Sequence, residues 1–170
     1  MKPSRLGVIL VLSLTGFSCA TFGSLANVVR PPQFEQDSEQ PAEIRLVGPG
    51  LGRPLGGAAV RVYMRVTNPN PFGFRLTRLT TDLELEGRQA ATGDFPLGLP
   101  LGAREESTVP IDLSISFADI PSLANVIQRA ATGDEVGYEL SGTVGIDAGS
   151  LGTPVFGPMT LVEGELVVRR

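Results

Sequence analysis

The sequence predicts a mostly β protein, a two-sheet antiparallel sandwich with one short α-helix. From residue 43 onward, apolar residues alternate with polar ones, which indicates strands that face a shared core on one side and water on the other. The 170 residues include 21 Gly and 14 Pro, which favour many turns over long helices. A chain of this length forms one ordinary domain with a real core.

The first strands follow from this alternation. Ile44 and Leu46 indicate a short first strand. The next strand has an apolar face and a polar outer face, which consist of Val60, Val62, Met64 and Val66, and of Arg61, Tyr63, Arg65 and Thr67.

The strand after that changes phase. Its two apolar sets fall on opposite faces, and they are Phe72, Phe74 and Leu76, then Leu79, Leu83 and Leu85. Because a straight strand buries only one phase, we expect a bulge or bend near Thr77.

Further strands are predicted over 109–117, 136–146 and 162–168. Pro110 offers no N–H to a ladder, so its strand lies at a sheet edge there or begins there. Turns are expected at Glu86-Gly87, Gly102 and Gly157-Pro158. Residues 120–131 instead show helical spacing, with Asp119 as N-cap and Gly133 as the stop, and we expect this helix to lie against a sheet.

The first 19 residues are predicted to be a signal peptide. Lys2 and Arg5 precede an apolar run from Leu6 to Phe17, which is shorter than the roughly 20 residues of a membrane-spanning helix. A buried N-terminal helix is the alternative. Residues 20–42 are then expected to form a flexible tether, because Gln33 to Gln40 is polar and acidic, and the domain proper covers 43–170.

Cys19 is the only cysteine, so the chain can form no internal disulfide. Gly16-Phe17-Ser18-Cys19 resembles a bacterial lipoprotein cleavage site and predicts acylation of Cys19, which would anchor the protein to a membrane. By the same resemblance, Ala20 suggests the outer membrane, with the domain facing the periplasm. In the alternative, ordinary signal peptidase cleaves after Ala20 and the protein is soluble in the periplasm or secreted.

The run Asn68-Pro69-Asn70-Pro71 is interpreted as a strand terminator. Each proline fixes its own φ, removes a donor and pushes the preceding Asn toward extended geometry. Asn side chains can satisfy nearby backbone groups in a turn. None of these four side chains is a nucleophile or a base, so the motif is expected to be structural.

The residues also resemble a known family. The segments Val62 to Pro71, Leu83 to Gly87, Gly93 and Val109-Pro110-Ile111 are similar to the type 2 late embryogenesis abundant domain (LEA type 2), which overlaps the water-stress and hypersensitive-response (WHy) domain. The resemblance covers residues 43–170. It implies an immunoglobulin-like or fibronectin-like sandwich without catalytic residues, and a role in tolerance of desiccation or osmotic stress.

Little in the sequence points to chemistry. It contains no His, the commonest general base and metal ligand, and its net charge of −4 argues against nucleic-acid partners. Asp82, Glu84 and Glu86 share a strand face, which could hold a cation but is typical of a solvated surface. Arg61 and Arg65 could pair with them across strands.

Two further patterns lack essential parts. Glycines 48, 50, 52, 56 and 57 are not followed by the residues of a phosphate loop, and serines such as Ser107 have no His partner for a triad. We therefore expect no enzymatic activity, no cofactor and no metal. The leading interpretation is a non-catalytic envelope lipoprotein in stress tolerance, and the alternative is a membrane-tethered module that binds a protein or a lipid.

Overall fold

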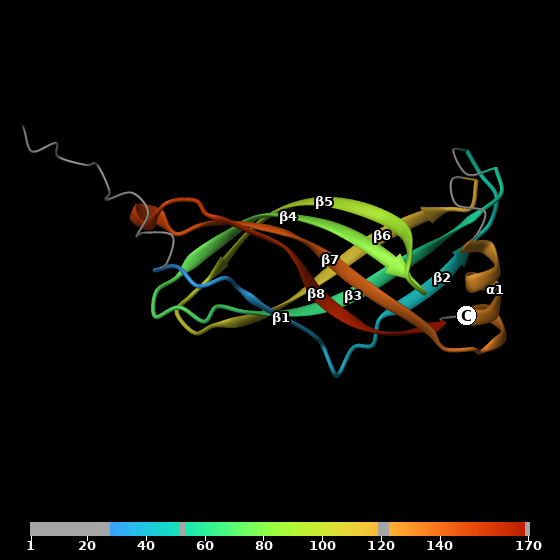
Figure 1. Cartoon of the computed structure of the whole chain (residues 1–170), viewed down its shortest axis with the longest axis horizontal. Helices are drawn as coiled ribbons and strands as arrows, with labels where there is room; N and C mark the ends of the chain where they lie inside the picture. Colours follow the sequence, from blue (N-terminus) through green and yellow to red (C-terminus); the bar gives the residue numbers. More distant parts are fainter. Residues whose placement is uncertain (1–27, 52–53, 119–122, 169–170) are drawn as a thin grey trace, which may run out of the picture.

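The computed structural model describes residues 28–51, 54–118 and 123–168, which form two facing antiparallel sheets (Figure 1). The first sheet contains β1 (Gln33–Gln36), β2 (Glu43–Val47), β3 (Gly57–Thr67) and β6 (Glu106–Ser116). The second sheet contains β4 (Phe74–Leu85), β5 (Arg88–Leu101), β7 (Val136–Asp147) and β8 (Val155–Val168), in the order β5-β4-β7-β8. The predicted mostly β sandwich is confirmed.

The two long sides of the sandwich differ. On one side the sheets are joined, because β2 pairs in parallel with the end of β8 at Glu43 and Ile44. On the other side, β5 pairs only with β4 among the described strands, and β6 pairs only with β3. Pro96 and Pro100 of β5 and Pro110 of β6 lie in these outer strands, as expected for residues that cannot donate to a ladder.

The core lies between the sheets and consists of the residues whose alternation predicted the strands. Val62 and Met64 of β3, Leu79 of β4 and Leu140 of β7 are completely buried. Removing such side chains from water is the main favourable contribution to folding. The sandwich therefore has a packed interior, with most of its charged residues turned outward on both sheets.

The phase change in β4 is produced by a bulge at Thr77, as predicted. Against β7, Leu76 pairs with Ile146 and Arg78 with Gly145, which leaves Thr77 without a partner. The extra residue turns the strand by one position, so Leu76 and Leu79 are both fully buried despite their odd spacing.

The turn predictions are partly wrong. Glu86 and Gly87 form the β4–β5 turn with φ of 50° and 69°, and Gly102 begins the β5–β6 turn. Gly157-Pro158, however, lies inside β8, where two residues bulge between the pairs Gly142–Met159 and Val144–Phe156. Gly and Pro mark irregular strands as well as turns, and the β7–β8 connection instead contains the short 3₁₀ helix η2 (Gly149–Leu151).

The predicted tether over residues 20–42 is wrong for its second half. β1 pairs with the end of β3 from Gln33–Thr67 to Gln36–Met64. Val29 and Ala42 are buried on either side of it. This segment is held by backbone hydrogen bonds and two flanking apolar residues, which its polar composition does not reveal. The leader, Cys19 and residues 20–27 lie outside the described residues.

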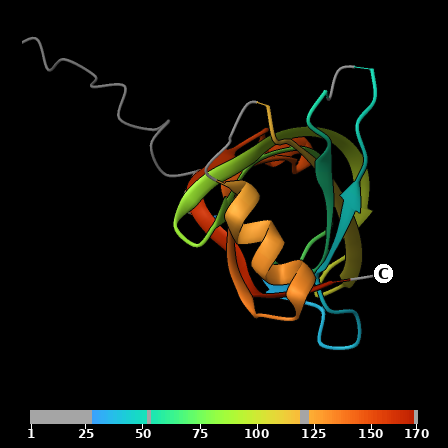
Figure 2. The same ribbon diagram turned by 90° about the vertical axis from the view of Figure 1, so that its right-hand side faces the viewer.

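The helix α1 (Ala124–Thr132) matches the helical segment expected at 120–131. Asp119, the predicted N-cap, lies outside the described residues. Gly133 has φ of 99°, and the N–H of Asp134 donates to the carbonyl of Arg129 at 3.1 Å, which is a Schellman ending. Figure 2 shows the helix lying across one end of the sandwich, so it closes an end rather than covering a sheet face.

The close contact between β7 and β4 gives a prediction for Gly142 of β7. A Cβ at this position would lie 2.0 Å from the carbonyl oxygen of Thr80 on β4. We expect Gly142→Ala to lower the free energy of unfolding by about 1–3 kcal/mol or more in urea denaturation, because the strands must separate locally. Gly48→Ala is the control, since a Cβ there meets nothing within 4 Å. Equal stability of the two variants would contradict this packing.

Candidate functional site

The motif Asn68-Pro69-Asn70-Pro71 connects β3 in the first sheet to β4 in the second. Asn68 is fully buried, and its side-chain N–H groups donate to the carbonyls of Phe72 at 2.8 Å and Gly102 at 2.7 Å. Gly102 belongs to the β5–β6 connection, which crosses between the same two sheets. Asn68 therefore ties together both chain crossings at this end of the sandwich, which we call the motif end.

Asn70, also fully buried, extends this network to the N-terminal segment. Its side-chain N–H donates to the carbonyl of Arg30 at 2.9 Å, and its side-chain oxygen accepts the N–H of Arg30 at 2.8 Å. The same amide also donates to the side-chain oxygen of Asn68 at 3.0 Å. The side-chain amide of Asn70 thus binds the backbone N–H and carbonyl of Arg30, as the backbone of a neighbouring strand would. Pro69 is half-buried and Pro71 is exposed.

Asp37 is the centre of a second buried hydrogen-bond network, in the connection from β1 to β2. Its carboxylate accepts the N–H of Glu39 at 2.9 Å, the hydroxyl of Thr108 at 2.9 Å and the guanidinium of Arg65 at 3.2 Å. These contacts, with the backbone N–H of Glu39 as the largest cause, lower the pKa of Asp37 below its ordinary value of 3.8. The carboxylate joins β1, β3 and β6, which is a structural role.

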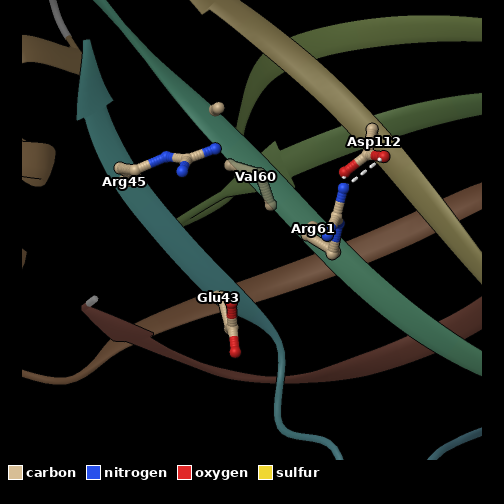
Figure 3. Close-up of a pocket in the computed structure, with 6 residues that line it drawn as sticks. Glu43, Arg45, Val60, Arg61 and Asp112 are labelled. Atoms are coloured by element: carbon tan, nitrogen blue, oxygen red, sulfur yellow. Dashed lines mark hydrogen bonds and ion pairs between the residues drawn. The ribbon is translucent and has the colours of Figure 1, made fainter. Parts of the chain in front are cut away.

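The outer face of the first sheet carries a small pocket of about 100 Å³ (Figure 3). Arg61 of β3 and Asp112 of β6 line this pocket and pair with each other through two hydrogen bonds of 2.6 and 2.9 Å. The hydrogen bond from Arg61, followed by the charges of Arg61 and Arg45, lowers the pKa of the Asp112 carboxyl. Ligand pockets usually measure 300–1,000 Å³, so this pocket is small for an organic ligand. The exposed ion pair contributes little to stability.

The expected pairing of Arg61 and Arg65 with Asp82, Glu84 and Glu86 is wrong. The acids lie on β4 and its turn, in the other sheet from β3, so the strands are not neighbours. The arginines pair with Asp112 and Asp37 instead. Both partners lie on strands or connections that contact β3, which the sequence alone does not identify.

Glutamates gather on the outer face of the second sheet. Glu84 of β4 lies opposite Glu139 of β7, and Glu139 lies opposite Glu163 of β8. With Glu86 and Glu165 they line a broad concavity of about 550 Å³, and we call these five residues the glutamate face. Like charges directly opposite one another destabilise a sheet. The sequence places Glu139 and Glu163 at outward positions of predicted strands. It does not give the strand register that brings both into one row with Glu84.

The other candidates from the sequence stay apart. Among the described residues, no group of three or more acidic, His or Cys side chains is arranged to hold a metal. Gly48, Gly50, Gly56 and Gly57 lie in or beside the β2–β3 connection, while Gly52 lies outside the described residues. Over the described part of the chain, no helix has the length and apolar character of a membrane span.

Asn68 gives a prediction that separates charge from shape. Asn68→Asp keeps the side-chain size but replaces the NH2 group, with its two donors, by an oxygen that faces the carbonyls of Phe72 and Gly102. We expect a loss of at least about 3 kcal/mol in the free energy of unfolding at pH 7, because an unpaired charge is buried. Asn125→Asp on the exposed surface of α1 is the matched control. Similar stability of both variants in chemical denaturation would contradict this role for Asn68.

Asp37 gives a prediction about pH. Because its pKa is lower in the folded state than the unfolded value of 3.8, its stabilising effect is present above pH 3.8 and is lost as the pH falls through the folded pKa. We expect the stability difference between wild type and Asp37→Asn to shrink as urea denaturation is moved from pH 6 to below pH 3.8. Asp82→Asn, on the exposed face of β4, is the control. A difference independent of pH would contradict the assignment.

The comparisons with known proteins agree with this architecture. The family model LEA_2, described as late embryogenesis abundant protein, matches residues 63–159. The solution structure of AT1g01470 from Arabidopsis thaliana is similar with a TM-score of 0.61 and 17% identity, covering 84% of this chain and 85% of that chain.

A second solution structure, At2g46140.1, carries the name of a late embryogenesis abundant (LEA) protein and has a TM-score of 0.53 and 18% identity, covering 85% of this chain and 76% of that chain. At these identities the two structures support the fold alone. A search of curated proteins finds no match to this sequence. Since the family model spans more than half of the 170 residues and begins at the strand that leads into the motif, the chain belongs to the LEA_2 family of late embryogenesis abundant proteins.

Proposed function

We propose that this protein is a lipid-anchored protein of the bacterial envelope whose LEA type 2 domain acts without catalysis in tolerance of desiccation or osmotic stress. The observation that carries the stress role is the match of residues 63–159 to the LEA_2 family. The proposed location in the envelope is based on the sequence, in which a leader with a positively charged start and an apolar run ends at the single Cys19.

The use of the buried polar side chains supports a non-catalytic role. Asn68, Asn70 and Asp37 are the kinds of residue that an active site would use, and each is committed to hydrogen bonds that join strands or connections. The sequence also lacks His, the commonest general base. The domain therefore acts through its surface and its stability.

The packed interior bears on the alternative function, a tethered module that binds a protein or a lipid. Inward residues of both sheets, such as Val62 and Leu140, are completely buried, which favours a protein at the surface over a lipid held between the sheets. Prolines in β5 and β6 make their edges poor templates for an added strand. A protein partner would thus bind an outer face rather than an edge.

The proposal is tested in a deletion strain complemented with wild type or with Cys19→Ser. We expect wild type to enter the detergent phase, with an intact mass that includes acyl chains on Cys19, and to restore survival of drying. Cys19→Ser is expected to enter the aqueous phase, because serine is not acylated.

Two outcomes would contradict different parts of the proposal. A wild-type protein that begins at Thr21 and carries no lipid would remove the membrane anchor. Equal survival of drying by the deletion and complemented strains would remove the stress role. Growth and envelope integrity without drying are the control, since a general envelope defect would lower both.

A further inference from the structure

The N-terminal segment reaches the domain at the motif end. Arg30 is fixed there by the two hydrogen bonds to Asn70, and Val29 beside it is buried. β1 then runs along β3 toward the other end, where α1 and the end of β8 lie (Figure 1). Any anchor that precedes residue 28 therefore pulls on the motif end.

The chain before this point is short. Nine residue steps separate Cys19 from Val28, which span at most about 30 Å when fully extended. β4, with 12 residues, gives the sandwich a length of about 40 Å between its two ends. A molecule anchored at Cys19 cannot stand inverted, with its α1 end on the membrane, because the linker is shorter than the domain.

The charges favour the same orientation. The motif end carries Arg30, Arg75 and Arg104 as well as Glu105, Glu106 and Asp147, which lies opposite Arg75, so its positive and negative charges balance. The glutamate face lies in the α1 half of the second sheet, where β4 ends and β7 begins. Arg129 of α1 pairs with Glu86 at 3.7 Å and offsets one of the five negative charges of the glutamate face. A surface of anionic lipids therefore still repels the glutamate face more strongly than the motif end.

We propose that the domain stands on the membrane with its motif end against the lipid headgroups and its α1 end and glutamate face directed away. This inference rests on the proposed acylation of Cys19. It gives Asn70 a second role: besides closing the motif, its amide fixes the point from which the membrane linker departs. Partners in the surrounding compartment then meet the glutamate face and α1 first.

The orientation is tested by energy transfer in vesicles of phosphatidylethanolamine and phosphatidylglycerol that contain an acceptor-labelled lipid. The full acylated protein carries one donor dye, either at Ser150→Cys in η2 of the motif end or at Gln128→Cys on α1, and both positions are exposed. Acylated Cys19 does not react with the dye. We expect clearly higher transfer from position 150 than from position 128.

The possible results distinguish the membrane anchor from the orientation of the domain. Vesicle binding with equal or reversed transfer would overturn the orientation and leave the anchor in place. Loss of vesicle binding would overturn the anchor and the orientation together. Asn70→Ala removes the hydrogen bonds that hold Arg30, so the chain is first fixed to the domain at β1. We then expect the difference in energy transfer between positions 150 and 128 to become smaller. Asn125→Ala should leave that difference unchanged. An unchanged difference in folded Asn70→Ala would overturn the positioning role of Asn70.

Discussion

The buried amide of Asn68 is the interaction on which this fold most depends. The β3–β4 and β5–β6 connections both carry the chain from one sheet to the other at the same end, and the two N–H groups of this amide bind one carbonyl from each. Because Asn68 is fully buried, its two N–H donors would be costly without acceptors, so the amide favours the arrangement in which the two crossings lie side by side. Asn70 and Arg30 then add the N-terminal segment to the same network.

Features of the fold that depend on neighbouring residues could be predicted from the sequence. Features that depend on contacts between distant residues could not. The bulge at Thr77 was visible because both apolar phases lie within one strand. β1 was missed because its stability comes from hydrogen bonds to β3, about 30 residues away, and not from its own polar residues. For the same reason Asp112 and Asp37 were not recognised as the partners of Arg61 and Arg65. The Asn-Pro-Asn-Pro motif was correctly placed as a strand terminator, but its contacts with Arg30 and Gly102 require the fold.

Both outer faces carry an ion pair between neighbouring strands, which on the second sheet joins Arg78 of β4 to Asp94 of β5, but only the second sheet also carries a row of glutamates. On the first sheet, Arg61 and Asp112 neutralise each other across neighbouring strands. On the second sheet, Glu84, Glu139 and Glu163 are placed side by side in register. Sheet stability alone would not favour such a row. The row concentrates negative potential on one face of the LEA type 2 domain while the rest of the surface stays mixed in sign.

The parallel pairing of β2 with the end of β8 has a consequence for how the molecule forms. Glu43 and Ile44, near the beginning of the domain, pair with Val167 and Val168, more than 120 residues later. Contacts between such distant residues slow folding, because a large loop must close before they are gained. The joined side of the sandwich therefore forms only after the last strand is available, and a chain still emerging from a ribosome holds its first strands without their final neighbour.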